Sequence, residues 1–217
     1  MALHLREDVT LYFCRHGETE ANVQLRFQGR TVDTPLTPRG REQAHAVAQS
    51  LKDVAANPAA LAYVCSPLQR ARTTMEIIRS DLGLAPTDYT ADPRLQEINL
   101  GAWDGLTDAE AKALDPAMFE KRGNDKWNVR VPGGGENYAD VAARAESWIG
   151  EMTADTFAVA HGAFTRILRG LFMGVDWKAM SNLDEKQGVL FRVRGNTIKR
   201  FDPPEGLEKP AGLHPSG

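Results

Sequence analysis

The sequence has little cysteine, no long apolar run and no apparent export signal. Only two of its 217 residues are cysteines, Cys14 and Cys65, and two cannot build a disulfide scaffold in a chain of this size. No stretch approaches 18 uncharged apolar residues, so we expect no membrane-spanning helix. The first ten residues, MALHLREDVT, lack the apolar core of a signal peptide. These absences predict a globular protein in the cytoplasm.

An excess of charge of one sign is also missing. The 26 Lys and Arg residues nearly balance the 29 Asp and Glu residues, which gives a formal net charge of −3. Such a balance provides no overall attraction to nucleic acid or to an anionic membrane. We therefore expect neither as a partner, and any anion that the protein binds must meet a local cluster of positive charge. The sequence carries no signal of oligomeric state.

Short apolar runs alternate with helical patterns along the chain. The three runs that predict buried strands are residues 9–14, 61–65 and 157–160. The helical patterns that follow them are residues 37–51, 67–82 and 163–173, with Thr37 as an N-cap, Pro67 opening the second helix and Gly83 ending it. This alternation predicts an α/β fold, a three-layer sandwich with a mainly parallel central sheet flanked by helices.

The remaining segments complete one domain, expected over residues 1–205. Residues 136–153 are amphipathic, and Arg194-Gly195-Asn196 predicts a hairpin turn between strands at 189–193 and 197–201. Between the chemical motifs lies a candidate lid insertion at about 106–135, with a short helix at 108–114 and a polar, turn-rich remainder. Residues 206–217 are expected to form a flexible tail.

Polar side chains of an unusual kind follow all three predicted buried strands. The segments are Arg15-His16-Gly17-Glu18-Thr19, Ser66-Pro67-Leu68-Gln69-Arg70-Ala71 and His161-Gly162. Because ligands of open α/β sheets bind at the carboxyl ends of the strands, we expect these segments to converge. The guanidinium forks of Arg15 and Arg70, together with His16 and His161, would form a compact cationic pocket suited to a tetrahedral oxyanion. The sequence therefore predicts a phosphate site, to which helix amino termini add N–H donors.

A histidine beside a bound phosphate can act as a nucleophile. The reference pKa of histidine is about 6.5, so a neutral imidazole is available near pH 7. Attack on phosphorus would give a phosphohistidine, and the leaving alkoxide would need a proton from a nearby carboxylic acid. Glu97 is the best candidate acid, since it lies in an irregular stretch whose glycines allow close approach of the backbone.

The motifs resemble, in their order along the chain, those of the histidine phosphatase superfamily, the phosphoglycerate-mutase-like proteins. Arg15-His16-Gly17-Glu18-Thr19 is similar to the RHG signature of that family. The further matches are Asn22, Gln28-Gly29, Pro35-Leu36-Thr37 with Gly40, Ser66 through Ala71, Glu97 through Gly105 (similar to E-x-x-x-G-x-W-x-G) and His161-Gly162. The segment from Pro132 to Glu136 resembles P-G-G-E-S, with an extra glycine and with Asn137 in place of serine. The resemblance covers about residues 9–201.

The resemblance implies a phosphoglycerate-mutase-like fold and a set of residue roles. His16 would be the phosphorylated nucleophile and Glu97 the proton donor and acceptor, with Arg15, Arg70 and His161 holding the phosphoryl group. The residues implied to bind the substrate are Arg15, Asn22, Gln28, Gly29, Arg70, His161 and Gly162, with Gln28 and Gly29 acting through backbone groups. The family needs no metal, so we expect no metal and no other cofactor.

The same phosphohistidine could serve a phosphatase or a mutase, depending on what accepts the phosphoryl group. In the cofactor-dependent mutases the motif around the acid reads E-R-H-Y-G, whereas this chain has Glu97-Ile98-Asn99-Leu100-Gly101. Those mutases also carry a pair of adjacent arginines in their longer insertion, and residues 106–135 contain no Arg-Arg pair. We therefore expect a phosphomonoesterase that hydrolyses a small phosphorylated metabolite, with a phosphoglycerate mutase as the alternative.

One further function remains open, and several residues outside the motifs have simpler expected roles. A phospho-ligand sensor without turnover is a further alternative, although the intact set of His16, Glu97 and His161 argues against it. Among the tryptophans, Trp127 is the one expected near the pocket mouth. His4, His45 and His214 have no motif partners, and both cysteines end apolar strands, where small apolar packing is the expected role.

Overall fold

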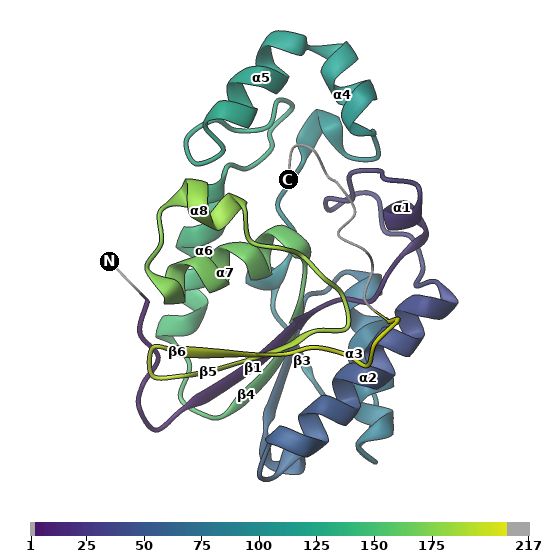
Figure 1. Ribbon diagram of the computed structural model, residues 1–217, viewed down its shortest axis with the longest axis vertical. Coiled ribbons are helices and arrows are strands. Elements are labelled where there is room, and N and C mark those ends of the chain that lie inside the picture. The colour runs from purple at the N-terminus through teal and green to yellow at the C-terminus, as the bar shows by residue number, and fades with distance from the viewer. Residues whose placement is uncertain (1–2, 208–217) are drawn as a thin grey trace.

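The computed structural model describes residues 3–207, and within them a six-stranded sheet forms the centre of the fold (Figure 1). The strands are β1 (Thr10–Arg15), β2 (Ala62–Cys65), β3 (Thr90–Ala91), β4 (Thr156–Ala160), β5 (Leu190–Arg194) and β6 (Thr197–Phe201). Their spatial order is β3-β2-β4-β1-β5-β6. β1, β2, β3 and β4 run parallel, whereas β5 and β6 are antiparallel to their neighbours. The predicted α/β class with a mainly parallel sheet is confirmed.

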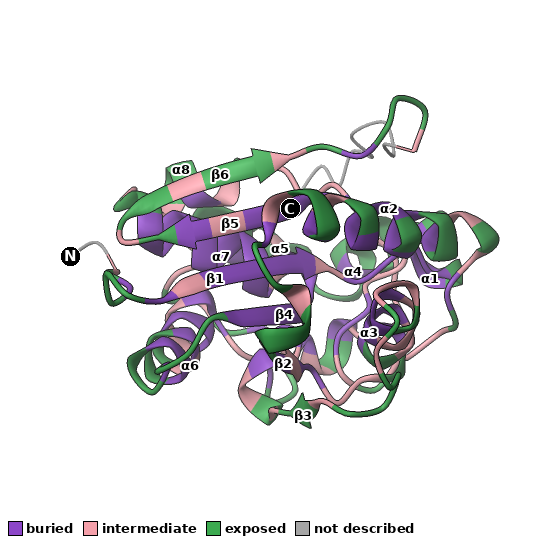
Figure 2. Ribbon diagram, turned by 90° about the horizontal axis from the view of Figure 1, so that it is seen from below, coloured by how far each residue is buried: buried purple, intermediate pink, exposed green. Residues whose placement is uncertain are grey.

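Helices cover both faces of this sheet. α2 (Pro38–Val54) and α3 (Gln69–Asp81) pack together on one face, and α6 (Tyr138–Gly150) and α7 (Gly162–Met173) on the other (Figures 1 and 2). The central strands are buried, while the edge strands β3 and β6 are largely exposed (Figure 2). Each face of a central strand is therefore covered by helix, as predicted for a three-layer sandwich.

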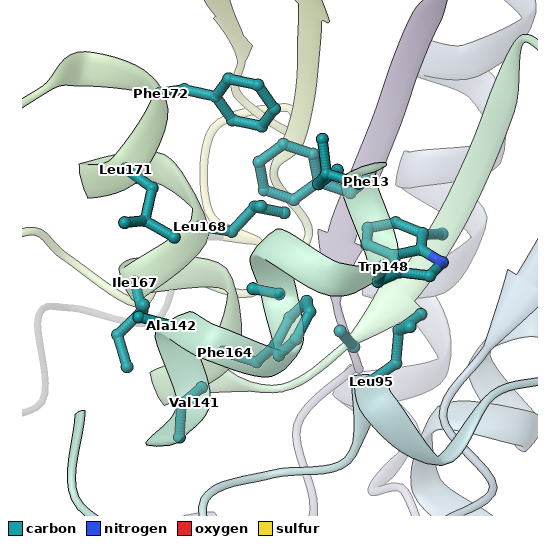
Figure 3. Close-up of a cluster of buried hydrophobic side chains, with 14 of the residues drawn as sticks. Phe13, Leu95, Val141, Ala142, Trp148, Phe164, Ile167, Leu168, Leu171 and Phe172 are labelled. Carbon is teal, nitrogen blue, oxygen red and sulfur yellow. The ribbon is translucent and has the colours of Figure 1, made fainter. Parts of the chain in front are cut away.

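The alternation of side chains along β1 divides the core in two. Leu11 and Phe13 belong to the larger cluster, where Phe13 lies near Phe164 and Leu168 of α7 (Figure 3). Tyr12 and Cys14 point the other way, into the cluster under α2 and α3. Cys65 lies in that second cluster as well. Both cysteines are free and buried, and burial raises the pKa of each thiol, which suits a packing role.

Two sequence predictions about helix boundaries are wrong. Pro67 was expected to open the second helix, but α3 begins at Gln69. The Gln69 N–H donates a hydrogen bond of 2.5 Å to the carboxylate of Asp33, which caps the helix at this point from a distant loop. Residues 115–135, expected to be polar and turn-rich, also contain a helix. Asp115 accepts a hydrogen bond from the Met118 N–H at 2.9 Å and so starts a further helix, α5 (Pro116–Asn124), directly after α4 (Asp108–Leu114).

The other elements are short. They are the helices α1 (Glu20–Val23) and α8 (Trp177–Ser181) and the 3₁₀ turns η1 (Pro58–Ala60), η2 (Pro93–Leu95) and η3 (Gly101–Trp103). Gly83 follows α3 with a φ of +73°, in line with its expected role at the helix end. None of the helices between residues 3 and 207 has the length and apolarity to cross a membrane. Residues 208–217 of the expected flexible tail, His214 included, lie outside the described residues.

Candidate active site

The three polar segments meet at the carboxyl ends of β1, β4 and β2, which lie side by side. The register aligns Arg15 with Ala160 and Cys65 with Val159, so the strands end at the same edge. The His16 N–H then donates to Ala160 O at 3.0 Å, and the Ser66 N–H to Val159 O at 3.1 Å. These two bonds extend the sheet pattern beyond the strands and bring the loops together at this edge.

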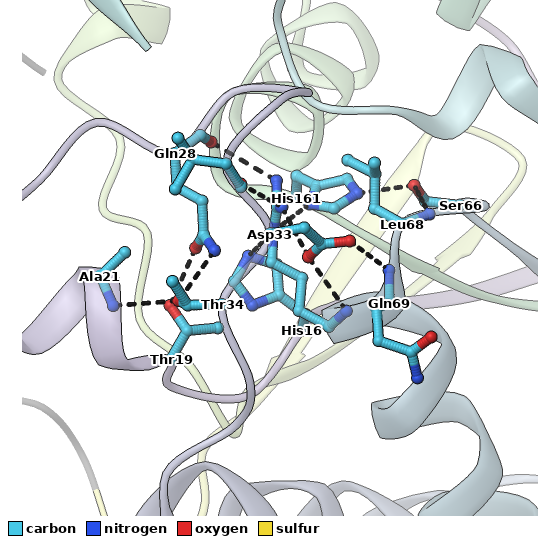
Figure 4. A network of polar contacts seen from close by, with 12 residues as sticks. His16, Thr19, Ala21, Gln28, Asp33, Thr34, Ser66, Leu68, Gln69 and His161 are labelled. Carbon is cyan, nitrogen blue, oxygen red and sulfur yellow. Dashed lines mark hydrogen bonds and ion pairs between the residues drawn. The ribbon is translucent and has the colours of Figure 1, made fainter. Parts of the chain in front are cut away.

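Arg70 lies between the two histidines of the site. Its Nε is 3.2 Å from His16 Nε2 and 3.2 Å from His161 Nδ1, and the two imidazole centroids are 5.1 Å apart (Figure 4). The rest of the guanidinium is held from behind by Asp33 Oδ1 at 3.0 Å and by the carbonyl of Gly29 at 2.8 Å. All three side chains are almost fully buried. The expected convergence of Arg70, His16 and His161 is therefore seen in the structure.

Hydrogen bonds assign the protons of both imidazoles. His16 Nδ1 lies 2.7 Å from the carbonyl of Gly17, which can only accept, so Nδ1 carries the proton and Nε2 keeps its lone pair. His161 Nδ1 accepts from Arg70, so its Nε2 carries the proton toward Ser66 Oγ at 2.7 Å. Burial, reinforced by the positive charge of Arg70, holds the pKa of both histidines well below the usual 6.5. His16 therefore presents a neutral, nucleophilic Nε2 at neutral pH.

Glu97 lines the same pocket as His16. Its Oε1 accepts from the Ile98 N–H at 2.9 Å, and its Oε2 accepts from the Ala163 N–H in the first turn of α7 at 3.3 Å. Burial raises the pKa of this carboxyl above its usual value, and the nearby Glu185 carboxylate raises it further. A carboxyl group with a raised pKa retains a proton more readily and can donate it to a leaving group.

The other predicted site residues take different places. Arg15, Asn22 and Gln28 line the pocket, whereas Gly29 and Gly162 do not. Gly29 contributes its carbonyl to Arg70 instead. A Cβ on Gly162 would lie 2.6 Å from Glu185 Oε2, so the start of α7 and this carboxylate are in close contact. Arg70 and His161 lie directly behind His16 rather than in the pocket wall.

Sequence reasoning missed Asp33 and Glu185. Asp33 holds Arg70 and caps α3, yet it lies between motifs and has no local signal. Glu185 lies 3.5 Å from Arg15 Nη1 and 2.6 Å from Arg166 Nη2. One signal could have found Glu185: β5 is antiparallel to β1, so the residues just before β5 lie at the carboxyl end of β1. The structure brings no group of three His, Cys, Asp or Glu together as a metal site in the residues it describes.

Aromatic and basic side chains form much of the remaining wall. They are Arg26, Phe27, Trp103, Phe119, Arg122, Lys126, Tyr138 and Arg166. The tryptophan that lines the pocket is Trp103, whereas Trp127, which was expected near the pocket mouth, is not among the lining residues. Phe119, Arg122 and Lys126 belong to the segment 106–135, so that segment contributes directly to the pocket.

Comparisons with known proteins agree with this geometry. Residues 11–197 match the family model of the histidine phosphatase superfamily (branch 1). A glucosyl-3-phosphoglycerate phosphatase of Mycolicibacterium vanbaalenii is 32% identical over 209 residues, covering 89% of this chain and 87% of the relative. The adenosylcobalamin/alpha-ribazole phosphatase of Escherichia coli is 29% identical over 183 residues, covering 82% of this chain and 86% of the relative.

A solved structure shares the fold over most of its length. Bacillus stearothermophilus YhfR superposes with a TM-score of 0.74 at 30% identity, covering 88% of this chain and 94% of that one. The phosphatase class predicted from the sequence is the class of the two curated relatives above. The family match spans nearly all of the described residues, and the chain therefore belongs to the histidine phosphatase superfamily.

Proposed function

We propose that the protein is a phosphomonoesterase that hydrolyses a small phosphorylated metabolite through a phosphohistidine on His16. One observation carries the proposal. Arg70 Nε lies 3.2 Å from His16 Nε2, and the proton of His16 is on Nδ1, so a neutral nucleophilic nitrogen stands beside a buried cation. Glu97, whose pKa burial raises, lines the same pocket and supplies the acid that the reaction needs.

The reaction takes place in two steps. His16 Nε2 attacks phosphorus while the bond to the ester oxygen breaks, and Glu97 gives its proton to the departing alkoxide. Water then attacks the phosphorus, the P–N bond breaks, and the Glu97 carboxylate takes the proton of that water. Inorganic phosphate leaves, and His16 returns to the neutral form. The charges of Arg15 and Arg70 stabilise the phosphoryl oxygens during both displacements.

The other predicted site residues have supporting roles in the proposed reaction. His161 carries its proton on Nε2 and accepts from Arg70 on Nδ1, which keeps the guanidinium turned toward His16. Asn22 and Gln28 lie in the pocket wall, where we propose that Asn22 contacts the substrate through its side chain and Gln28 through its backbone. The Gln28 amide itself is bonded to Thr19 and Thr34. Gly29 acts through its carbonyl on Arg70, and Gly162 lets the start of α7 approach Glu185.

The segment 106–135 is proposed to be the lid of a single domain that spans residues 1–205. α4 and α5 lie beyond the carboxyl edge of the sheet (Figure 1). The segment is anchored by an ion pair of 2.8 Å between Arg26 and Glu110 and by a hydrogen bond of 2.7 Å from the Phe27 N–H to Leu106 O. A cover of this kind would exclude bulk water from the phosphoryl group.

Support for a small substrate comes from the relatives, whose names describe phosphatases of glucosyl-3-phosphoglycerate and α-ribazole. We propose a substrate of that general kind, a low-molecular-weight phosphomonoester, handled in the cytoplasm without nucleic acid. The near balance of acidic and basic residues supports the exclusion of a polyanionic partner.

Rapid acid-quench labelling tests the mechanism. Wild-type protein mixed with a ³²P-labelled monoester should yield an acid-labile protein phosphate, and His16→Ala should yield none. An active wild-type enzyme that never becomes labelled would sink the proposal. Interconversion of 3- and 2-phosphoglycerate, primed with 2,3-bisphosphoglycerate, that greatly outpaces phosphate release would make the protein a mutase instead. Binding of phosphorylated ligands without any hydrolysis would indicate a sensor.

A further inference from the structure

The segment just before β5 contacts residues at and after the carboxyl end of β1. The carbonyl of Glu185 accepts a hydrogen bond of 2.7 Å from Arg15 Nη1, and two residues later Gln187 Nε2 donates one of 2.9 Å to Asn22 Oδ1. Because β5 is antiparallel to β1, the residues that precede β5 lie where β1 ends. Gln187 belongs to none of the sequence motifs, yet it is bonded to a residue of the pocket wall.

The bond between Gln187 and Asn22 links the interior of the protein to the pocket. Gln187 is 1% exposed, and Asn22, which is 165 positions away in the sequence, lines the pocket together with His16. Burial keeps out the water that could replace this bond, so removal of the Gln187 amide would leave the Asn22 oxygen without one of its donors. The orientation of the Asn22 side chain therefore depends on Gln187.

A backbone donor identifies the two ends of the Asn22 amide. The Thr19 N–H lies 3.1 Å from Asn22 Oδ1, and since an N–H can only donate, the atom that faces it is the oxygen. Gln187 Nε2 is the second donor to that same oxygen. An amide oxygen has two lone pairs, and these two bonds use both of them. The amide therefore offers a ligand in the pocket its Nδ2 donors rather than an acceptor, and a donor is what an oxyanion requires.

The local partner of Asn22 holds it less firmly than Gln187 does. The bonds between Thr19 and Asn22 form the capping box of α1, a helix of only four residues. A helix so short has little stability of its own. Gln187 belongs instead to a segment that is tied to α7 by the ion pair of 2.6 Å between Glu185 and Arg166. The distant bond is thus the one that restricts rotation of the Asn22 amide.

We propose that Gln187 is a positioning residue, which holds the Asn22 amide so that its Nδ2 donates to an oxygen of the phosphoryl group. The inference rests on the proposed function, because that function places the phosphate at His16 and assigns Asn22 to the substrate. A donor that is oriented before the reaction stabilises the charge on the phosphoryl oxygens without any reorganisation. Without Gln187, the amide would be able to turn and present Oδ1, which repels those oxygens.

Gln187→Met tests the positioning role, since it keeps a side chain of similar length but removes the donor. We expect kcat/KM for hydrolysis of 4-nitrophenyl phosphate to fall about tenfold, with most of the loss in kcat, because the Asn22 donor acts on the charge of the transition state. Asn22→Ala, which removes the donor itself, should cost at least as much.

A double-mutant cycle separates positioning from a general structural role. If Gln187 acts through Asn22, then Gln187→Met should change kcat/KM by less than about twofold in a protein that already carries Asn22→Ala. Val193→Ala is the control for lost stability, because Val193 is a buried residue of β5 that lies in the larger core cluster and outside the pocket. It should lower the melting temperature and leave kcat/KM within about twofold of wild type.

Gln187→Glu adds a signature in the pH profile. An ionised carboxylate can only accept, so it would draw Asn22 Nδ2 away from the phosphate, whereas a protonated carboxyl donates as the amide does. Burial raises the pKa of a carboxyl group, which brings this change toward neutral pH. The activity of Gln187→Glu should therefore exceed that of Gln187→Met at low pH. Division by the activity of Gln187→Met at each pH cancels the pH dependence that the two variants share.

Three results would overturn the positioning role. They are a folded Gln187→Met variant with the kcat/KM of wild type, a loss that persists in the presence of Asn22→Ala, and a Gln187→Glu variant that is no more active than Gln187→Met at any pH. If Gln187→Met does not fold, as judged by circular dichroism, Gln187→Glu at alkaline pH takes its place in the cycle. Failure of the proposed function looks different, because the wild type would then release no phosphate from the ester. Calorimetric binding of inorganic phosphate then decides the positioning role, which predicts that the losses in affinity from Gln187→Met and Asn22→Ala do not add.

Discussion

Substitution of Asp33 tests how the phosphate-binding arginine is positioned. The Asp33 carboxylate accepts from Arg70 Nη1 at 3.0 Å, and it also caps α3 through the N–H groups of Gln69 at 2.5 Å and Arg70 at 3.3 Å. Two opposite results are conceivable for Asp33→Asn. By charge alone, removing an acid near an anion pocket would strengthen phosphate binding. If Asp33 instead acts by holding Arg70 against His16, its loss would slow the reaction.

The geometry favours the second result and sets its size. A charge-assisted hydrogen bond contributes about 1.5–3 kcal/mol, so its loss lowers the rate about 10- to 100-fold when it is fully expressed in the transition state. Arg70 keeps the carbonyls of Gly29 at 2.8 Å and Val32 at 3.3 Å as acceptors, which retain part of its orientation. We therefore expect kcat/KM to fall about tenfold, with most of the loss in kcat. Weaker capping of α3 should also lower the free energy of unfolding by about 1 kcal/mol.

The assay is steady-state phosphate release together with urea unfolding. Asp81→Asn is the control, because Asp81 is an acid at the far end of α3 that pairs with the exposed His45 at 2.6 Å and lies outside the pocket. It should leave kcat/KM within about twofold of wild type. An Asp33→Asn variant that binds phosphate more tightly and keeps its kcat would refute the positioning role.

Three further predictions concern charge and packing in the pocket. Burial raises the pKa of Glu97, so kcat/KM should fall as the pH rises through that pKa, because the acid then loses its proton. Glu97→Gln should remove this alkaline limb of the pH–rate profile and lower kcat about 10²- to 10⁴-fold. Burial, reinforced by the nearby Arg166 and Arg122, lowers the pKa of Lys126 to about 8, so the pocket should lose this positive charge above about pH 8. KM for an anionic phosphomonoester should then rise in a steady-state pH series, and Lys126→Met should not show this rise. Gly162→Ala should displace Glu185, whose Oε2 would lie 2.6 Å from the new Cβ, and so weaken the ion pairs of Glu185 with Arg15 and Arg166. Because a flexible side chain can move away, we expect kcat/KM to fall in the phosphate-release assay while thermal melting changes little; Gly150→Ala, in open space, should change neither.

Much of the site could be predicted because its residues follow strand ends. A strand is a local pattern, and parallel strands end at a common edge, so His16, Ser66 and His161 converge without any knowledge of side-chain contacts. Asp33 and Glu185 could not be found in this way. Each acts on an arginine from a distant segment, and a single sequence does not reveal which acid meets which base across 37 or 170 positions.

The segment 106–135 shows how one dipeptide admits two interpretations. Asp115-Pro116 was expected to break a helix, and it does end α4 at Leu114. The same pair is also a favourable start, with Asp115 as N-cap and Pro116 in the first turn, and α5 begins there. The second helix was not predicted, since residues 115–135 were expected to be polar and turn-rich, and so nothing in the pattern indicated that Arg122 lies on a helix. Only the packing of α5 over Trp103 and Tyr138 shows that this charge is buried.

The partners of each cation indicate which of them can respond to a substrate. Arg70 is held by the carbonyl of Gly29 and the carboxylate of Asp33, so the contacts that a phosphate oxygen can replace are those of its Nε with His16 and His161. Arg15 is bound at 2.7 Å to the carbonyl of Glu185 and at 3.5 Å to its carboxylate, and a phosphate dianion can displace that weak carboxylate contact.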